Sequence, residues 1–350
     1  MASIAIVNSF DYHWECLGFL LHWICHNHKE LDIYVYASHK SVYEWIQVYD
    51  MIFDKLKVRV EILPTLNESI CNMHESIIVL SGDDPFLKSC DHNGISVIIH
   101  ALEPIFDISN HAKKINYAPF EGSRRPFVIG AFVPNTFDIA ESKSTISYNI
   151  LFSGTLERNS TDWVAISRFH EYVKTNVSVS VTYINRKLDR YILDLFMDIG
   201  ERFNYIENAL PLDLFKHVAN CDAVISFKTD KFSKSCLSGI VPLAISFLKP
   251  MLLHTDVCTF VKGFGVCIPY DDVERAVALA KNTGFRDLVA SRTRAIEYTA
   301  NVLCAQNFRF TRSYAIRSYN NHNGIFTCVS MISIILLFII PMVRYKTRVL

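Results

Sequence analysis

The sequence is poor in glycine and proline, has no excess of either charge, and shows no regular cysteine spacing. The 12 Gly and 11 Pro among 350 residues exclude collagen-like and low-complexity classes. Lysine plus arginine equals aspartate plus glutamate at 35 each, so no overall basic field draws the chain onto nucleic acid. We therefore expect no nucleic-acid partner.

The ten cysteines are scattered and lie mostly inside apolar runs, as is typical of buried reduced thiols rather than a disulfide framework. The N-terminal apolar run has no basic residues before it and stops at Asn8, too early for a secretory leader. We expect no cleaved signal. Half of the residues are hydrophobic, which predicts packed cores, and a chain of this length predicts two domains.

Residues 325–343 form an uncharged run that, as a helix, would be about 28 Å long and nearly match a bilayer core. Arg344, Lys346 and Arg348 follow in the basic tail 344–350. We expect a single-pass transmembrane helix with the lipid bilayer as partner, rather than a buried core helix. Because the sequence ends soon after the run, a tail anchor with a cytosolic body is the simplest topology.

The first 134 residues alternate short β-branched runs with helical patterns. Trp14, Leu17, Leu21 and Ile24, for example, recur at helical spacing. Apolar strands separated by helices predict a parallel sheet covered on both faces. The expected strands are 4–7, 32–37, 58–62, 77–81, 97–100 and 127–133.

The polar stretch 135–147 interrupts this pattern and is expected to link residues 1–134 to a second domain of residues 148–284. A helical segment, 285–323, should follow. The fold class is therefore α/β, with two Rossmann-like doubly wound domains in tandem and a C-terminal transmembrane helix. Strands of the second domain are expected at 149–153, 177–184, 203–206, 222–227, 251–254 and 265–269.

Three segments of the second domain carry a more specific pattern: NILFSGT at 149–155, LPLDLFKHVANCDAVISFKTD at 210–230 and SCLSGIVPLAISFLKPMLLH at 235–254. They resemble the opening strand and glycine turn, the helix and strand before the donor site, and the following helix, turn and strand of GT-B glycosyltransferases, families 1 and 4. The resemblance implies a GT-B fold with the acceptor on the first domain. It also implies a nucleotide-diphosphate sugar as co-substrate and no cofactor.

One signature of that family is missing. Many retaining members place two glutamates eight residues apart before a proline, and the matching positions here are Leu243 and Ser235. An inverting enzyme, a divergent one, or a fold without catalysis are all compatible with this departure.

Ligands of doubly wound sheets bind beyond the carboxyl ends of the strands. His13 follows the first strand and is a candidate general base, with Asp11 beside it. The alternative is that Asp11 caps the next helix and His13 is structural. The candidate acceptor-binding residues, which follow strands of the first domain, are Asn8, Ser9, His100 and Glu103.

A donor diphosphate needs backbone N–H groups and cations. Gly154 permits close backbone approach, although it could be an ordinary turn and the lysines a solvated face. The candidate donor and phosphate-binding residues are Gly154, Thr155, Arg158, Lys228, Lys234, Ser238 and Gly239.

We assign no metal site. The cluster around His22 has ligand types, but no second pair matches it elsewhere: His22, Cys25, His26 and His28. Asp83 and Asp84 could bind Mg²⁺, but a turn capped by Asp before Pro85 is the better interpretation.

The resulting prediction is a membrane-anchored glycosyltransferase that uses a nucleotide sugar and an unknown, membrane-associated acceptor. Two alternatives stay open: another GT-B-fold sugar enzyme of the pyruvyl transferase or epimerase type, or a catalytically silent membrane-tethered binding or scaffold protein.

Overall fold

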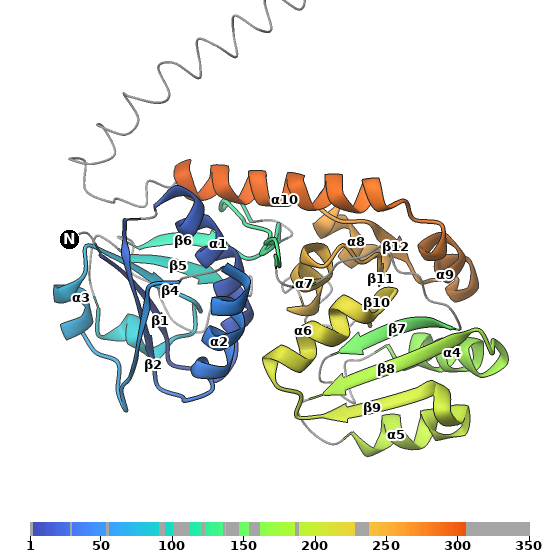
Figure 1. The fold of residues 1–350 in the computed structure, drawn as a ribbon. Helices are drawn as coiled ribbons and strands as arrows, with labels where there is room; N and C mark the ends of the chain where they lie inside the picture. The colour runs from blue at the N-terminus through green and yellow to red at the C-terminus, as the bar shows by residue number, and fades with distance from the viewer. Residues whose placement is uncertain are drawn as a thin grey trace, which may run out of the picture. The chain divides into compact units, whose positions relative to one another are not determined.

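The computed structural model describes residues 3–28, 30–53, 56–90, 95–100, 112–120, 123–135, 137, 147–153, 162–185, 189–227 and 238–305. All of these belong to one compact unit of the chain. The described residues hold two six-stranded sheets, one in each half of the sequence (Figure 1).

The first sheet is parallel throughout, with the strand order β3-β2-β1-β4-β5-β6. Its central strand is buried along nearly its whole length, as expected for a parallel sheet covered on both faces. The strands are β1 (Ser3–Asn8), β2 (Asp32–Ala37), β3 (Val58–Ile62), β4 (Ser76–Val79), β5 (Ile95–Ile99) and β6 (Lys113–Asn116).

Helices α1 (Leu17–Asn27) and α2 (Val42–Phe53) lie on one face of this sheet, and α3 (Ser69–Met73) on the other (Figure 1). The change of face accompanies a change in the side on which successive strands are added, because β1 to β3 progress one way from the centre and β4 to β6 the other. Two short 3-10 helices, η1 (Trp14–Cys16) and η2 (Pro85–Lys88), follow β1 and β4. The sheet therefore has a topological switch point between β1 and β4.

The strand expected at 127–133 does not form. Its middle residues are buried, but only its start pairs with a strand, in a single bridge between Phe127 and Asn116 of β6. Further along, the backbone bonds to side-chain hydroxyls: Ile129 N donates to Thr299 Oγ1 at 3.0 Å and Phe132 N to Ser246 Oγ at 3.0 Å. Because these buried backbone N–H groups already have hydrogen-bond partners, the apolar run does not have to pair with a neighbouring strand. The sixth strand is instead the short polar KKIN segment of β6.

The second sheet is also parallel, with the order β12-β11-β10-β7-β8-β9. Its strands are β7 (Tyr148–Ser153), β8 (Val179–Asn185), β9 (Phe203–Glu207), β10 (Ala223–Ser226), β11 (Met251–Leu253) and β12 (Cys267–Pro269). In this sheet β7 to β9 are added on one side of the centre and β10 to β12 on the other, so a second switch point lies between β7 and β10.

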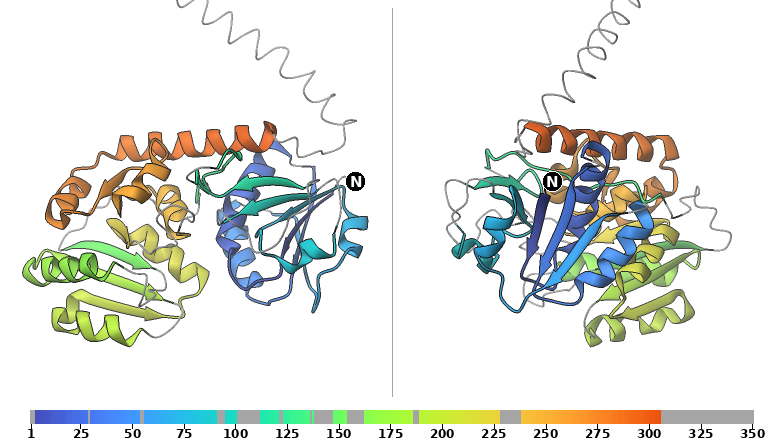
Figure 2. Two further views of the ribbon diagram at one scale, coloured as in Figure 1. Left: turned by 180° about the vertical axis from the view of Figure 1, so that it is seen from behind. Right: turned by 60° about the vertical axis from the view of Figure 1, so that its left-hand side comes forward.

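Helices cover each face of the second sheet (Figures 1 and 2). Phe169 and Val173 of α4, Ile192 and Phe196 of α5, and Val277 of α9 belong to a core cluster that includes β7, β8 and β10. The helices and one 3-10 turn of this half are α4 (Trp163–Thr175), α5 (Arg190–Phe196), η3 (Met197–Arg202), α6 (Pro211–Asn220), α7 (Ile240–Ser246), α8 (Thr255–Val261), α9 (Val273–Lys281) and α10 (Phe285–Ala305).

Aromatic side chains from both halves meet around Phe215 of α6. Trp45 and Tyr49 of α2 each pack edge-on against its ring, with centroids 5.9 Å apart. Phe132 and Phe247 lie 6.1 and 5.5 Å from it. Buried edge-to-face pairs stabilise packing beyond the area they bury, so this cluster fixes α2 against α6.

The expectation of reduced thiols is wrong for four cysteines, because Cys71 pairs with Cys90 and Cys258 with Cys267 in disulfides. The free cysteines of the described part are Cys16, Cys25, Cys221 and Cys304.

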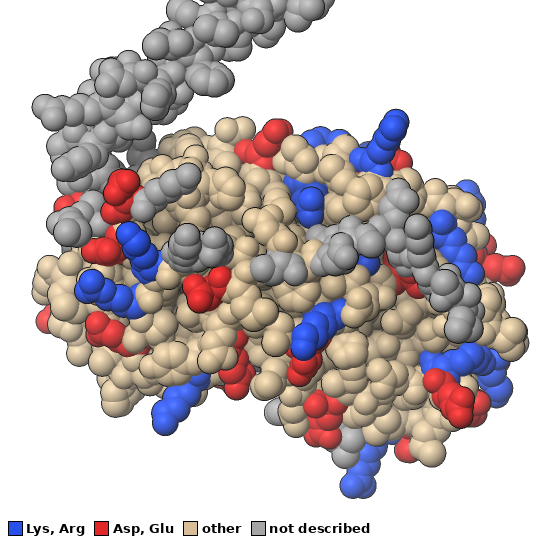
Figure 3. All heavy atoms as spheres, viewed as in Figure 1, with Lys and Arg blue, Asp and Glu red and all other residues tan. Residues whose placement is uncertain are grey.

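Several predictions on organisation fall outside the described residues. They concern most of the linker 135–147, the end of segment 285–323, the apolar run 325–343 and the basic tail 344–350. Within the residues that the structure describes, no helix combines the length and apolarity needed to cross a bilayer. On the face shown in Figure 3, basic and acidic side chains are interspersed.

Candidate functional site

The loop after β1 is tied to the loop after β4 at the first switch point. Ser9 donates from its backbone N to Asp84 Oδ2 at 2.7 Å and from its hydroxyl to Asp84 Oδ1 at 2.6 Å. Asp84 is fully buried and also caps η2 by accepting from Phe86 N at 2.9 Å. The turn-capping interpretation of Asp84 is thereby confirmed, and Ser9 has an intramolecular partner.

Asn8 organises the same loop. Its side-chain nitrogen donates to Tyr12 O at 2.7 Å, and its oxygen accepts from Phe10 N at 3.2 Å. These bonds fold the chain back on itself before His13, the residue that precedes η1. His13 has φ 67° and ψ 10°, the left-handed region that is uncommon for residues other than glycine. Residues held in sparsely populated backbone conformations cluster at functional sites.

Two side chains hold the His13 ring. The ring of His100 stacks on it with centroids 3.8 Å apart and planes 17° from parallel. Glu15 places Oε1 3.6 Å from His13 Nδ1. Both candidate histidines, one from the loop after β1 and one after β5, therefore lie together beyond the carboxyl ends of the parallel strands.

Glu15 is ionised in this setting. Burial by itself would raise its pKa, but the neighbouring His13 ring outweighs that effect and lowers the pKa to about 2. Asp11, the carboxylate predicted to assist His13, is exposed, and its charge acts on Tyr12. The carboxylate that faces His13 is thus Glu15 rather than Asp11.

His100 is neutral. Burial, followed by the charge of His13, lowers its pKa to about 3 against the opposing effects of Glu15 and Leu80. Its Nε2 lies 2.8 Å from the Leu80 carbonyl oxygen, which can only accept, so Nε2 carries the proton. Cys16 Sγ lies 3.5 Å from the same nitrogen, and burial raises the pKa of that thiol. His100 is therefore a fixed neutral support for the His13 ring.

Gly239, which immediately precedes α7, lies against Glu15. A β-carbon at this position would be 3.0 Å from Glu15 Oε1, closer than side chains ordinarily approach. Ser238 precedes it and accepts a backbone hydrogen bond from Val241 at 3.0 Å. The structure thus brings one predicted donor-side residue, Gly239, next to the His13 and Glu15 pair.

The other predicted donor residues lie outside the described part of the chain: Gly154, Thr155, Arg158, Lys228 and Lys234. The same holds for Glu103 among the predicted acceptor residues. The strands that precede the donor segments, β7 and β10, are adjacent and end at the second switch point. Their carboxyl ends are where a doubly wound sheet binds its ligand.

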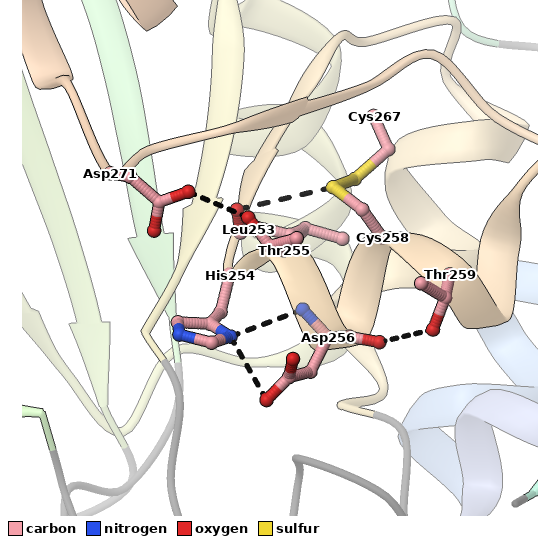
Figure 4. Close-up of a disulfide and its surroundings, with 8 residues drawn as sticks. All are labelled: Leu253, His254, Thr255, Asp256, Cys258, Thr259, Cys267 and Asp271. Atoms are coloured by element: carbon pink, nitrogen blue, oxygen red, sulfur yellow. Dashed lines mark hydrogen bonds and ion pairs between the residues drawn. A yellow bond between two sulfur atoms is a disulfide. The ribbon is translucent and has the colours of Figure 1, made fainter.

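His254 follows β11 at this same edge and was not singled out from the sequence. Its Nδ1 accepts from the backbone N of Asp256 at 3.1 Å and caps α8 (Figure 4). The neighbouring Thr255 hydroxyl donates to Asp271 Oδ2 at 2.6 Å. The disulfide of Cys258 and Cys267 joins α8 to β12 beside them. A polar residue at the end of the predicted strand 251–254 is the signal that could have identified His254.

Among the described residues, no group of three or more His, Cys, Asp or Glu is arranged to hold a metal ion. His26 Nδ1 instead lies 2.8 Å from the His22 carbonyl oxygen on α1, a helical side-chain bond.

No protein-family model matches the chain. No curated protein matches it by sequence either. Solved structures do match its fold. HepE from Anabaena, solved with UDP and glucose, has 10% identity and a TM-score of 0.56 over 88% of this chain and 100% of that one.

A glycosyltransferase from Rickettsia africae has 9% identity and a TM-score of 0.56 over 88% of this chain and 98% of its own. A putative UDP-N-acetylglucosamine 2-epimerase from Listeria monocytogenes has 13% identity and a TM-score of 0.52 over 89% and 97%. The two parallel six-stranded sheets and these matches define the fold as tandem Rossmann-like domains of the GT-B type.

Proposed function

We propose that this chain is a sugar-nucleotide enzyme, and specifically a glycosyltransferase. The observation that supports it best is the group of His13, Glu15 and His100 at the first switch point, with Glu15 in contact with Gly239 before α7. The structural neighbours HepE, solved with UDP and glucose, and the Listeria epimerase suggest the class of ligand.

His13 would act as the general base. Ionised Glu15 faces Nδ1 and favours the tautomer with its proton there, which leaves Nε2 free to accept a proton. The acceptor hydroxyl gives its proton to Nε2 while its oxygen bonds to the anomeric carbon of the donor sugar. The bond from that carbon to the diphosphate breaks, and the nucleoside diphosphate leaves. Glu15 then stabilises the imidazolium.

The donor diphosphate would be bound at the second switch point by the segments after β7 and β10. Gly154, Thr155 and the two residues just before α7, Ser238 and Gly239, would supply backbone donors. Arg158, Lys228 and Lys234 would neutralise the charge that develops on the leaving group. No cofactor is needed for this chemistry.

Epimerisation is the second candidate. Two observations favour epimerisation over a retaining transfer. The fold matches the Listeria structure, and the paired glutamates are missing, with Leu243 and Ser235 at those positions. A catalytically silent scaffold is the third candidate.

We also propose that residues 325–343 anchor a cytosolic body to a membrane and so bring the site to a membrane-associated acceptor.

Titration of the full chain in detergent with UDP, dTDP, GDP and CMP by calorimetry tests the ligand class. Selective binding of one nucleotide, weakened by Arg158→Ala, supports the proposal. Because a ligand at a hundred times its dissociation constant stabilises a fold by about 2.7 kcal/mol, thermal unfolding provides a parallel readout. A cooperatively unfolding protein that binds none of the four would contradict it.

A further inference from the structure

We infer that the loop after β1 is a binding site for a neutral saccharide, with Tyr12 as the ring on which the sugar stacks and Asp11 as an acceptor for its hydroxyls. The inference rests on the proposed function only in calling this sugar the acceptor substrate. Binding of the sugar itself requires no donor.

Tyr12 is the exposed end of a series of contacting rings. Its side chain is 38% exposed, which is unusual for a large aromatic beside a strand end. Phe10 stacks on it with centroids 4.7 Å apart and planes 10° from parallel, and His13 meets it edge-on at 4.6 Å. An exposed aromatic ring that is braced in this way offers apolar contact area to a ligand at small entropic cost.

The loop is held in place before any ligand arrives. Asn8 Nδ2 donates to the Tyr12 carbonyl oxygen, and Ser9 makes its two bonds to buried Asp84. The position of the ring is thus fixed relative to His13, its neighbour in sequence. A sugar stacked on Tyr12 would have a hydroxyl within reach of the proposed base.

The charge around Tyr12 decides which class of ligand fits. The charges that act on Tyr12 are those of Asp11, Asp83 and Asp84, and residues 8–16 and 80–90 contain only one Lys or Arg, Lys88. Burial, and then the charges of Asp83, Asp11 and Asp84, raise the pKa of the Tyr12 hydroxyl. Such a field repels phosphate and carboxylate groups, whereas carboxylates readily accept hydrogen bonds from sugar hydroxyls.

A ring with an apolar face beside carboxylates therefore matches a neutral polyol. It suits neither a phosphorylated sugar nor an acidic lipid headgroup. A purely aliphatic ligand would make no hydrogen bond with the exposed Asp11 carboxylate and would displace water from it, which costs binding free energy.

The test is saturation-transfer NMR and calorimetry on the full chain in detergent, without nucleotide. The probes are a panel of neutral mono- and disaccharides and glucose 6-phosphate. We expect at least one neutral sugar to bind at millimolar concentration and glucose 6-phosphate to bind less. Tyr12→Ala should weaken binding roughly tenfold, since loss of a stacked ring removes about that factor.

Tyr12→Phe keeps the ring and should retain most of the affinity. Tyr43→Ala, at a tyrosine of α2 that is 45% exposed, is the matched control and should change nothing. Equal affinity in Tyr12→Ala and wild type, tighter binding of glucose 6-phosphate, or no neutral sugar bound at all would each overturn the inference. Sugar binding without any nucleotide binding would support this inference and contradict the proposed function. Nucleotide binding without any sugar binding would support the proposed function and contradict this inference.

Discussion

Glu15 Oε1 occupies the space beside Gly239, where a β-carbon would be only 3.0 Å away. The carboxylate that faces His13 in the first half of the chain therefore also rests against the residue before α7 in the second half. This contact joins the candidate base to the candidate donor segment, and it makes the glycine a sensitive position.

Gly239→Val should displace the Glu15 carboxylate and reduce turnover without unfolding the protein. A branched side chain cannot fit beside Oε1 unless the carboxylate moves, and Glu15 would then no longer hold the His13 tautomer. Steady-state kinetics measure the effect, with Gly284→Val as the matched control. Gly284 has a similar contact, 3.2 Å to Asp287 Oδ2, away from the site. Equal activity in the two variants would refute the role given to this contact.

Gly18→Ala should destabilise the fold by about 1–3 kcal/mol, the usual cost of overpacking a core. A β-carbon on Gly18 would lie 3.0 Å from Tyr49 Cε1 and still closer to the Phe132 ring. Helix propensity alone would make the Ala variant more stable than Gly by roughly 1 kcal/mol, so the sign of the measured change shows whether propensity or the tight contact dominates. Urea unfolding measures it, and Phe132→Leu in the same chain should recover part of the loss. A more stable Gly18→Ala protein would show that the contact is not tight.

Stability should fall as the pH is lowered from 6.5 towards 4. Burial, followed by the charges of His26 and Arg292, lowers the pKa of His22 from 6.5 to about 4. Between these values the unfolded chain binds the proton and the folded chain does not, so the stabilisation is complete above 6.5 and is lost on acidification. For this buried side chain the difference is about 3 kcal/mol.

Urea unfolding at several pH values tests this, with His22→Gln expected to make the profile less steep; His28 and His100, whose pKa values are lowered to about 4 and about 3, supply the remaining slope. Exposed His39→Gln serves as the control and should follow the wild type. If His22→Gln keeps the full pH dependence, the effect arises elsewhere.

Reduction of the Cys258–Cys267 disulfide should lower the free energy of unfolding by about 2–3 kcal/mol, the chain-entropy value for a closed loop of this size. The two cysteines are 9 positions apart and join α8 to β12 beside His254. Unfolding of Cys258→Ala/Cys267→Ala, compared with Cys304→Ala, measures it. Peptide mapping under non-reducing conditions that finds both thiols free would contradict the pairing.

The alternation of strands and helices could be predicted because buried parallel strands are continuous apolar runs. Both sheets follow from it, with β2 and β3 at the expected residues. The failures have a common cause, since local pattern does not reveal the partners of the backbone. The apolar segment after Phe127 bonds to Thr299 and Ser246, which are distant in sequence.

The site was predictable to the extent that strand ends are. His13 and His100 each follow a strand, and the topology of the sheet brings them together. The pairing of Glu15 with His13 depends on the left-handed turn at His13, which no residue type announces. Cysteine pairing likewise requires the three-dimensional distances, because Cys71 lies on α3 and Cys90 in the segment after η2.

The central claim is that the chain consumes a sugar nucleotide with His13 as base. In the most direct measurement, the full chain is incubated with labelled UDP-, dTDP-, GDP- and CMP-sugars. Intact donor, epimer, free nucleotide and glycosylated or hydrolysed product are then separated and quantified. We predict release of one nucleotide at a rate that His13→Gln lowers by about 10²-fold or more while the protein stays folded. Intact donors throughout, or an undiminished rate in His13→Gln, would contradict the account.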